Sequence, residues 1–213
     1  KEGYKRINQI LTKLPAPKNS DLSQLDQEFL AQINQQFLVV IAAVNILSPN
    51  AIEIVVKSKI LASQTKIGQI FRLQNYHQLA PRVNGQILAM EGVAVTALAI
   101  DQQKSLISGV VIETGGSTNL IRNFKPNQPA IFMGPSGLPT EIAQNEIVML
   151  VGGGRGNMPL AAIGKEYKKQ GCKIIFFAGY RKNEYLIRQN EIEEASDVAV
   201  YAISEELPNI KLN

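Results

Sequence analysis

The clearest indication of the fold comes from Gly152-Gly153-Gly154-Arg155-Gly156-Asn157-Met158-Pro159-Leu160. It follows a short apolar run, Glu146–Val151, which predicts a buried strand. A helix is expected to begin near Pro159, because proline is favoured in the first helical turn. The helix is expected to end before Gly171, which stands where a glycine commonly terminates a helix. The stretch therefore predicts a strand, a glycine-rich loop and a helix in succession.

Two further strands and a second helix continue this alternation. Lys173–Ala178 and Asp197–Ala202 predict strands, and Asn183–Ser196 between them predicts an amphipathic helix. The β-α-β-α-β series points to a parallel, doubly wound sheet with right-handed crossovers.

The glycines of the loop are the strongest signal for a ligand. Glycines between a strand and a helix let the backbone approach a ligand closely, and they leave the first N–H groups of the helix free for a phosphate. Twelve of the 16 glycines of the chain lie between Gly109 and Gly179. As a G-x-G-x-x-G fingerprint the loop is incomplete, because Asn157 stands where the third glycine belongs. The alternative is a tight turn without a ligand, but four glycines in five residues exceed what a turn requires.

Upstream of the loop, the chain from Phe37 to about Lys125 predicts a small antiparallel barrel or sandwich. Six short runs at regular spacing carry this prediction: Phe37–Ile46, Ala51–Lys57, Gly68–Leu73, Gln86–Met90, Val93–Ile100 and Ser105–Glu113. The first 35 residues instead predict two amphipathic helices, with apolar spacing over 4–14 and 22–33. We interpret them as a docking segment or linker rather than a catalytic element.

The predicted fold class is two-domain, with an antiparallel β-barrel followed by an α/β Rossmann-like parallel sheet. The expected bounds are 1–35 for the N-terminal helical segment, 36–127 for the barrel and 128–213 for the nucleotide-binding domain. The chain begins with Lys1 rather than Met and stops soon after the third parallel strand. A fragment, or a domain completed by other chain segments, is the simplest explanation.

Composition excludes several other classes of protein. The net charge of +4 is spread thinly and tryptophan is absent, so no nucleic-acid partner is expected. The longest apolar run, Phe37 to Val44, is far shorter than the roughly 20 residues of a membrane helix, so no membrane is expected either. One cysteine, Cys172, and one histidine, His77, cannot form a metal cluster. Redox chemistry would require an organic cofactor, and a reducing cytoplasmic compartment is expected.

Five short motifs, in order, resemble those of the ferredoxin–NADP reductase-like flavoproteins. The glycine stretch resembles the G-G-G-x-G-x-x-P-L that opens the nucleotide half of that superfamily. Two further matches lie in the predicted barrel: Ile67-Gly68-Gln69-Ile70 resembles a barrel strand, and Gly115-Gly116-Ser117-Thr118 resembles the turn that binds the flavin pyrophosphate. Met133-Gly134-Pro135-Ser136-Gly137 resembles the G-P-x-G between the domains. Ala178-Gly179-Tyr180-Arg181 resembles the G-x-R after the second parallel strand. The resemblance covers residues 37–203. It is nearest to the dihydroorotate dehydrogenase electron-transfer subunits and to similar modules of large bacterial pyridine-nucleotide oxidoreductases.

The resemblance implies an FAD-binding barrel beside an NAD(P)H-binding domain, with hydride passing between nicotinamide and flavin. For the flavin phosphates it implies contacts at Gly115, Gly116, Ser117 and Thr118. For the dinucleotide it implies contacts along the glycine stretch, at Gly152, Gly153, Gly154, Arg155, Gly156, Asn157, Met158 and Pro159. It also implies cofactor contacts at Gly134 and Arg181. The leading hypothesis is an NAD(P)H:flavin oxidoreductase module that passes electrons to another domain or protein. The rival is a non-catalytic scaffold or docking fragment that has lost flavin binding, and a barrel that uses FMN is a third possibility.

One departure concerns the R-x-Y-S motif, in which arginine binds phosphate, tyrosine lies on the flavin and serine bonds near its reactive nitrogen. The corresponding strand has Val93 at the arginine, Val95 at the tyrosine and Thr96 at the serine. Only the hydroxyl remains, which makes Thr96 the candidate catalytic residue. Arg72 or Arg82 could supply the charge and Tyr76 the ring, although an ordinary surface role for Arg72 is an equal alternative.

The choice of dinucleotide rests on the end of the second parallel strand. An acidic residue there would hold the ribose of NAD, but Tyr180-Arg181-Lys182 brings cations instead. These favour NADP, while an arginine at this place also occurs in NAD users of the family.

Overall fold

The computed structural model describes residues 24–204 and divides the chain into two compact units, Lys1–Gln36 and Phe37–Asn213. In the first unit the predicted second helix is present as α2 (Gln24–Phe37), which also takes in the first residue expected to be strand. The predicted helix over 4–14 lies outside the described residues. The docking or linker role of this segment stays a prediction.

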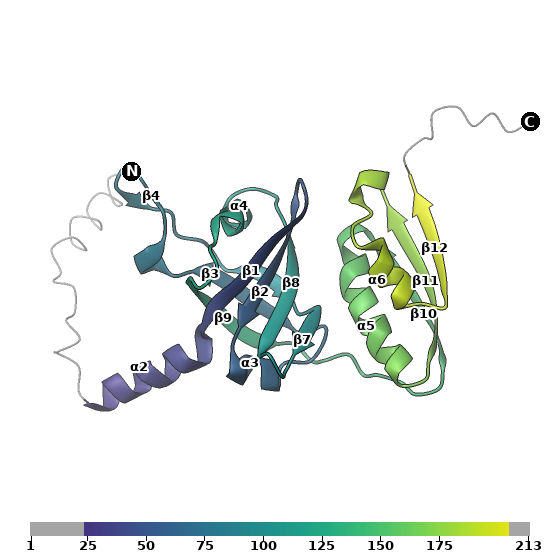
Figure 1. The fold of residues 1–213 in the computed structure, drawn as a ribbon, viewed down its shortest axis with the longest axis horizontal. Coiled ribbons are helices and arrows are strands. Elements are labelled where there is room, and N and C mark those ends of the chain that lie inside the picture. The colour runs from purple at the N-terminus through teal and green to yellow at the C-terminus, as the bar shows by residue number, and fades with distance from the viewer. Residues whose placement is uncertain (1–23, 205–213) are drawn as a thin grey trace, which may run out of the picture. The chain divides into compact units, whose positions relative to one another are not determined.

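The second unit begins with a seven-stranded sheet in the order β6-β3-β9-β1-β2-β8-β7, in which every neighbouring pair is antiparallel (Figure 1). Its strands are β1 (Leu38–Ser48), β2 (Ala51–Lys57), β3 (Ile70–Asn75), β6 (Val93–Thr96), β7 (Ala99–Asp101), β8 (Leu106–Ile112) and β9 (Pro129–Ser136). A separate hairpin joins β4 (Arg82–Val83) to β5 (Gln86–Ile87). Short helices α3 (Lys59–Gln64), η2 (His77–Leu79), α4 (Ser117–Leu120) and η3 (Ile121–Asn123) fill the connections.

The sheet curls like a barrel without closing, and one predicted strand explains how. Val93–Ile100, expected as a single strand, forms β6 and β7, which occupy opposite edges of the sheet. Between them the N–H of Ala97 donates to Gln69 O, and the N–H of Leu98 donates to Ser108 O. The chain therefore changes partner at this point and brings the two edges near each other. The predicted strand Gln86–Met90 is also shorter, because only its first two residues pair, in β5.

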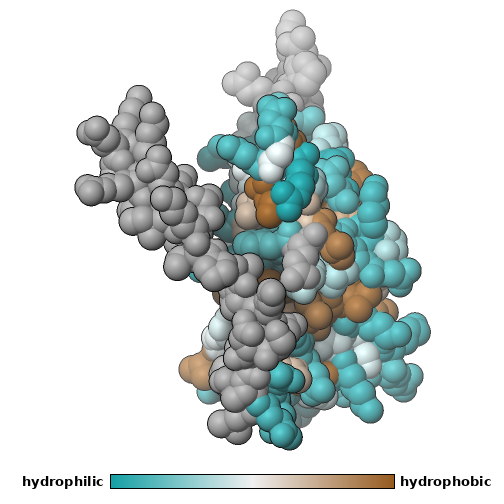
Figure 2. Space-filling model, turned by 90° about the vertical axis from the view of Figure 1, so that its left-hand side faces the viewer, coloured by the Kyte–Doolittle hydropathy of each residue, from teal (hydrophilic) through white to brown (hydrophobic). Residues whose placement is uncertain are grey.

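Inside the curled sheet lies a core of aliphatic side chains around two stacked rings. The rings of Phe71 and Phe132 have centroids 4.2 Å apart and are nearly parallel. Ile41, Ile54 and Ile107 are almost wholly buried with them. The alternation of buried and exposed residues along β2 and β8 is the pattern that predicted these strands. Outside, the described surface in Figure 2 is largely hydrophilic, with separate hydrophobic patches.

The second part of this unit is a parallel sheet in the order β10-β11-β12. Its elements are β10 (Ile147–Gly153), η4 (Gly154–Gly156), α5 (Asn157–Lys169), β11 (Lys173–Tyr180), η5 (Asn183–Tyr185), α6 (Gln189–Glu194) and β12 (Val198–Ile203). The predicted strand–loop–helix succession is confirmed, and Gly171 follows α5 with a φ of 79°. Residues 37–136 form the antiparallel half of the unit, and residues 147–204 form its parallel half.

Two details of the parallel half differ from expectation. Both α5 and α6 cover the same face of the sheet, so the described part is not doubly wound (Figure 1). Two right-handed crossovers that step in the same direction across a sheet place their helices on one face. The predicted helix 183–196 is split into η5 and α6, because Arg188 between them has a left-handed backbone with φ of 57° and ψ of 45°.

The boundary between the barrel and the nucleotide-binding domain stays a prediction, and the pairing of β9 bears on where it is best placed. The expected second domain begins at 128, but β9 pairs with β1 and β3 of the antiparallel sheet. We propose that the boundary lies instead in the segment 137–146, which joins β9 to β10. Among the described residues, no helix is long and apolar enough to cross a membrane.

The face of the parallel sheet opposite α5 and α6 is apolar and exposed. Successive side chains of a strand point to opposite faces, so residues that alternate with the buried Leu150 and Phe176 share this second face. They are Ile147, Met149, Val151, Phe177, Val198 and Val200. No described element covers them.

Candidate functional site

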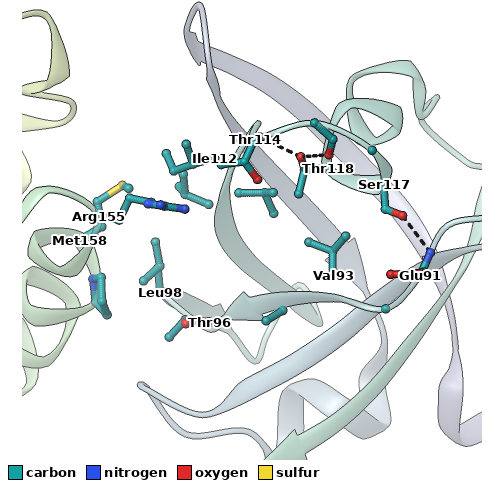
Figure 3. A pocket seen from close by; sticks show the side chains of 17 residues that line it. Glu91, Val93, Thr96, Leu98, Ile112, Thr114, Ser117, Thr118, Arg155 and Met158 are labelled. Carbon is teal, nitrogen blue, oxygen red and sulfur yellow. Dashed lines mark hydrogen bonds between the residues drawn. The ribbon is translucent and has the colours of Figure 1, made fainter.

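A pocket of about 560 Å³ lies where β6 and β8 meet the turn before α4 and the start of α5 (Figure 3). The side chains of Thr96, Leu98 and Ile112 point into it from the antiparallel half, and Arg155 and Met158 reach it from the parallel half. The rest of its lining is Glu91, Gly92, Val93, Ala94, Val110, Val111, Thr114, Gly115, Gly116, Ser117, Thr118 and Pro159. We call this the first pocket.

The turn Gly115–Thr118 forms one wall of the first pocket and is held by its own hydroxyls. Thr118 Oγ1 accepts a hydrogen bond from the N–H of Thr114 (2.9 Å) and donates to Gly115 O (2.7 Å). Ser117 Oγ accepts from the N–H of Glu91 (2.9 Å). Both glycines have positive φ, of 111° and 51°, and a Cβ on either would meet nothing within 4 Å. The turn thus presents open backbone, while the Thr118 hydroxyl is already engaged and the Ser117 hydroxyl keeps its proton for a ligand.

Strand β6 gives the first pocket an uncharged wall. Val93, Ala94 and Thr96 line the pocket, whereas Val95 is buried in the core of the sheet at 1% exposure. Arg155 is the only cation and Glu91 the only acid among the lining residues, and the lining holds no aromatic ring.

A second pocket, of about 750 Å³, lies at the carboxyl ends of the three parallel strands. Ligands commonly bind at this edge of open parallel sheets. The parallel half contributes Gly153, Gly154, Arg155, Met158, Gly179, Tyr180, Arg181, Tyr185, Ile187, Ala202 and Ser204. The antiparallel half contributes Asn50, Ile112, Glu113 and Thr114.

The glycine loop of the second pocket has an open side and a packed side. A Cβ on Gly153, Gly154 or Gly156 would meet nothing within 4 Å, so the backbone there is bare. A Cβ on Gly152 would instead clash with Asn157 Oδ1, because Asn157 is wholly buried beneath the loop. Asn157 Nδ2 donates to Gly179 O (3.1 Å), which ties the loop to the end of β11.

The N-terminus of α5 has the polarity of an anion site. In these described residues no side chain caps either η4 or α5, although the N–H of Asn157 is used by Gly154 O. The unpaired N–H groups and the helix dipole favour a negative group. Neither Arg155 nor Arg181 forms an ion pair within the described part of the chain, so both cations remain for a ligand.

Two ionisable groups at the rim of the second pocket are held in one protonation state. The hydrogen-bonded guanidinium of Arg122 holds the pKa of the Glu113 carboxyl below its usual value. Arg122 Nε donates to Glu113 Oε1 at 3.0 Å. Burial raises the pKa of the Tyr180 phenol. Glu113 is therefore a carboxylate and Tyr180 a neutral phenol near pH 7.

The two pockets adjoin. Ile112, Thr114, Arg155 and Met158 line both of them. A ligand in the second pocket would thus lie beside one in the first, separated by few side chains.

Comparisons with known proteins agree with this fold. The chain is 34% identical over 109 residues to the dihydroorotate dehydrogenase B (NAD(+)) electron transfer subunit homolog of Thermotoga maritima, and the match covers 51% of the chain and 39% of that protein. A solved NADH-dependent reduced ferredoxin-NADP oxidoreductase superposes with a TM-score of 0.65 at 24% identity, over 78% of this chain and 56% of that one. The ferredoxin reductase of carbazole 1,9a-dioxygenase gives a TM-score of 0.60 at 19% identity, over 78% and 49%. In sequence and in fold, the chain thus resembles the ferredoxin–NADP reductase-like superfamily.

Two further comparisons define how far this likeness extends. An uncharacterised protein of Rickettsia prowazekii is 32% identical over an alignment of 219 residues. The alignment covers 100% of this chain and 28% of that protein. No family model matches the chain. The chain thus spans between about a quarter and two fifths of the length of the Rickettsia and Thermotoga relatives.

Most of the residues suggested by the superfamily resemblance come together in the two pockets. The first pocket gathers Thr96, Gly115, Gly116, Ser117, Thr118, Arg155, Met158 and Pro159, and the second gathers Gly153, Gly154, Arg155, Met158 and Arg181. Their roles toward a cofactor stay predictions.

The structure does not bring the remaining predicted residues into either pocket. Arg72 is exposed and donates from Nη1 to Gly92 O (3.1 Å), and Tyr76 precedes the short helix η2. Arg82 donates from Nη1 to Gly85 O (3.4 Å). The residues predicted to replace the missing arginine and tyrosine therefore line neither pocket. Gly134 packs against the Phe71 ring, Gly152 and Asn157 pack against each other, and Gly156 lines neither pocket.

Sequence reasoning also missed several lining residues. Ser204 follows β12 directly, as Arg181 follows β11, and the rule that ligands bind at carboxyl ends of parallel strands could have found it. Leu98, Thr114 and Ile187 carry no local signal, since their place depends on how the two halves pack.

Proposed function

We propose that the chain is an NAD(P)H-dependent flavin oxidoreductase module, in which hydride passes between nicotinamide and FAD and electrons go on to another domain or protein. The observation that carries this proposal is the pair of adjoining pockets with Arg155 and Met158 in the lining of both. Two ring systems that exchange hydride need to be adjacent and shielded from water, and such a pair of pockets supports that requirement.

The first pocket fits a flavin nucleotide through backbone more than through side-chain charge. Bare backbone at Gly115 and Gly116, together with the Ser117 hydroxyl, would hold the diphosphate. The Thr96 hydroxyl would donate to or accept from the reactive edge of the ring, in the role we predict as catalytic. When bound, the flavin supplies the capacity to accept a hydride and release electrons. Arg155 would add the only side-chain cation.

The second pocket fits a nicotinamide dinucleotide. The diphosphate of the dinucleotide would lie on the open backbone of Gly153 and Gly154, before the N-terminus of α5. Arg181 would meet a ribose phosphate, which favours NADPH over NADH. Relatives described as NAD(+)-dependent keep NADH as the alternative.

The acceptor of the electrons is proposed from the relatives. Several are named as electron transfer subunits, and the chain spans less than two thirds of their length. We therefore propose an electron-accepting domain or protein as the partner and a cytoplasmic setting.

A second candidate function is a nucleotide-binding scaffold that has lost flavin. The specific observation in its favour is the first pocket's lining, which has one cation and no aromatic ring to stack on a flavin. This candidate keeps the dinucleotide site and lacks hydride transfer.

Titration with FAD, FMN, NADH and NADPH, read by flavin fluorescence and calorimetry, tests both candidates. We expect FAD to bind and its absorbance to bleach when reduced nicotinamide is added without oxygen. Gly153→Val is the diagnostic variant, because its φ of −131° suits valine and its Cβ meets only the open pocket. It should weaken dinucleotide binding about tenfold or more without loss of stability, whereas Gly153→Ala should change binding less. A preparation that binds dinucleotide but no flavin would favour the scaffold.

A further inference from the structure

Arg188 and Glu53 form an ion pair between the two halves of the second unit. Arg188 Nη2 lies 2.6 Å from Glu53 Oε1, and the two side chains are only 18% and 14% exposed. Glu53 belongs to β2 of the antiparallel sheet, and Arg188 stands immediately before α6 of the parallel half. Among the described residues it is the only ion pair that joins these halves.

Both partners are held in position by further bonds. Glu53 Oε2 accepts from Asn45 Nδ2 (2.9 Å) on the neighbouring strand β1. Arg188 Nη1 lies 2.9 Å from Glu191 Oε1 in the first turn of α6. A half-buried pair with fixed partners is less screened by salt than a surface pair.

The backbone of Arg188 is in an uncommon conformation. Its φ of 57° and ψ of 45° are left-handed, which is unfavourable for a residue with a long side chain. This conformation interrupts the predicted helix 183–196 and separates η5 from α6. The Arg188–Glu53 contact gives a physical reason for an arginine to occupy such a place.

Each residue of the ion pair is close in sequence to residues that line the second pocket. On one wall, Tyr185 and Ile187 line the pocket, and Ile187 is the neighbour of Arg188. On the other wall, Asn50 lines the pocket and precedes β2, the strand that carries Glu53. The only chain connection between the halves is the segment 137–146.

We propose that Arg188 and Glu53 form a positioning latch that fixes the separation of the two walls of the second pocket, so that a dinucleotide bound there is presented to the first pocket. The inference rests on the proposed function for its catalytic consequence but not for its structural one. The latch acts through geometry, because Arg188 and Glu53 line neither pocket. Its loss would let the parallel half rotate about the segment 137–146.

The structural test is a distance measurement between spin labels in the two halves. Labels at Gln103→Cys and Lys173→Cys, in a Cys172→Ala background, occupy exposed positions of the antiparallel and parallel halves. We expect Glu53→Gln to broaden the distance distribution and shift its centre. Arg188→Gly should do the same while folding normally, because glycine takes the left-handed backbone without strain. Glu194→Gln removes an ion pair of 2.8 Å with Lys165 inside the parallel half and should change nothing.

The functional test is reduction of added FAD by NADPH in the same variants. Misplacement of reacting groups by about 1 Å can cost a hundredfold in rate, so we expect the two latch variants to lose about ten- to a hundredfold. Their circular dichroism should match that of the unmodified chain. Unchanged label distances in both Glu53→Gln and Arg188→Gly would overturn the latch. Failure of the unmodified chain to reduce FAD would refute the proposed function while the label distances still decide the latch.

Discussion

Gly109 fixes how closely β8 approaches β6. A Cβ at this position would clash with Val95 Cγ1 and would lie 2.6 Å from the carbonyl oxygen of Thr96. The sheet can therefore curl and place the Thr96 hydroxyl in the first pocket only because residue 109 has no side chain. The spacing of glycines along the sequence indicates a ligand site, but for Gly109 the reason is strand packing.

We predict that Gly109→Ala destabilises the fold by about 1–3 kcal/mol, the usual cost of inserting atoms into a packed interior. Urea unfolding measures it. Gly153→Ala is the matched control, since its Cβ has open space and should leave the unfolding midpoint unchanged. Equal urea-unfolding midpoints for Gly109→Ala and Gly153→Ala would contradict the close approach of β8 to β6 at Gly109.

The protonation of Glu53 gives a prediction about pH. Burial raises the pKa of this carboxyl, but hydrogen bonds from Asn45 and Arg188 and the charge of Arg188 outweigh it, so the pKa is below the ordinary 4.5. A lowered pKa in the folded state means that the contribution to stability is complete above 4.5 and is lost as the pH falls through the lower value. Thermal unfolding below pH 4.5 should therefore be less steeply pH-dependent in Glu53→Gln than in the unmodified chain. Identical pH profiles would show that the pair adds no stability.

At the scale of elements, the loop between β10 and α5 combines predicted and unpredicted features. The glycines predict open backbone before a helix, and Gly153, Gly154 and Gly156 have it. Asn157, expected to contact a ligand, lies beneath the loop and bonds to β11 instead. Its role depends on Gly179, 22 residues away, which local spacing does not reveal.

We predict that Asn157→Ala costs about 1–3 kcal/mol of unfolding free energy, because a buried hydrogen bond to Gly179 O is lost. Dinucleotide affinity should fall as well, since the loop would no longer be tied to β11. Asn157→Asp, of similar size but without the Nδ2 donor, should show most of the loss. Urea unfolding and NADPH titration on the same samples separate the effect on stability from the effect on affinity. Unchanged stability of both variants would show that the hydrogen bond from Asn157 to Gly179 O does not stabilise the fold.

At the scale of the whole described chain, the parallel sheet has one covered and one exposed face. The exposed face carries six apolar side chains on adjacent strands, from Ile147 on β10 to Val200 on β12. Contiguous apolar surface of this kind is typical of interaction sites.

We predict that a hydrophobic fluorescent dye binds this face in the present chain. The double variant Met149→Lys, Val151→Lys should lower dye fluorescence by roughly a third, since it removes two of the six apolar side chains. Val40→Lys, at an exposed position on β1, is the control and should have little effect. A fall in dye fluorescence in Val40→Lys but not in the double variant would show that the dye binds another part of the surface.

Local sequence patterns were enough to predict the strand–loop–helix at residues 146–171, the alternating strands of the antiparallel sheet and the bare backbone of the glycine loop. These features follow from local periodicity and from the backbone freedom of glycine, which act within a few residues. Packing between distant segments set three other features. Val93–Ile100 divides between two sheet edges, Arg72 and Tyr76 stay outside the first pocket, and Arg188 pairs with Glu53. Each of those outcomes depends on contacts between residues far apart in the chain, whose energies no local pattern contains.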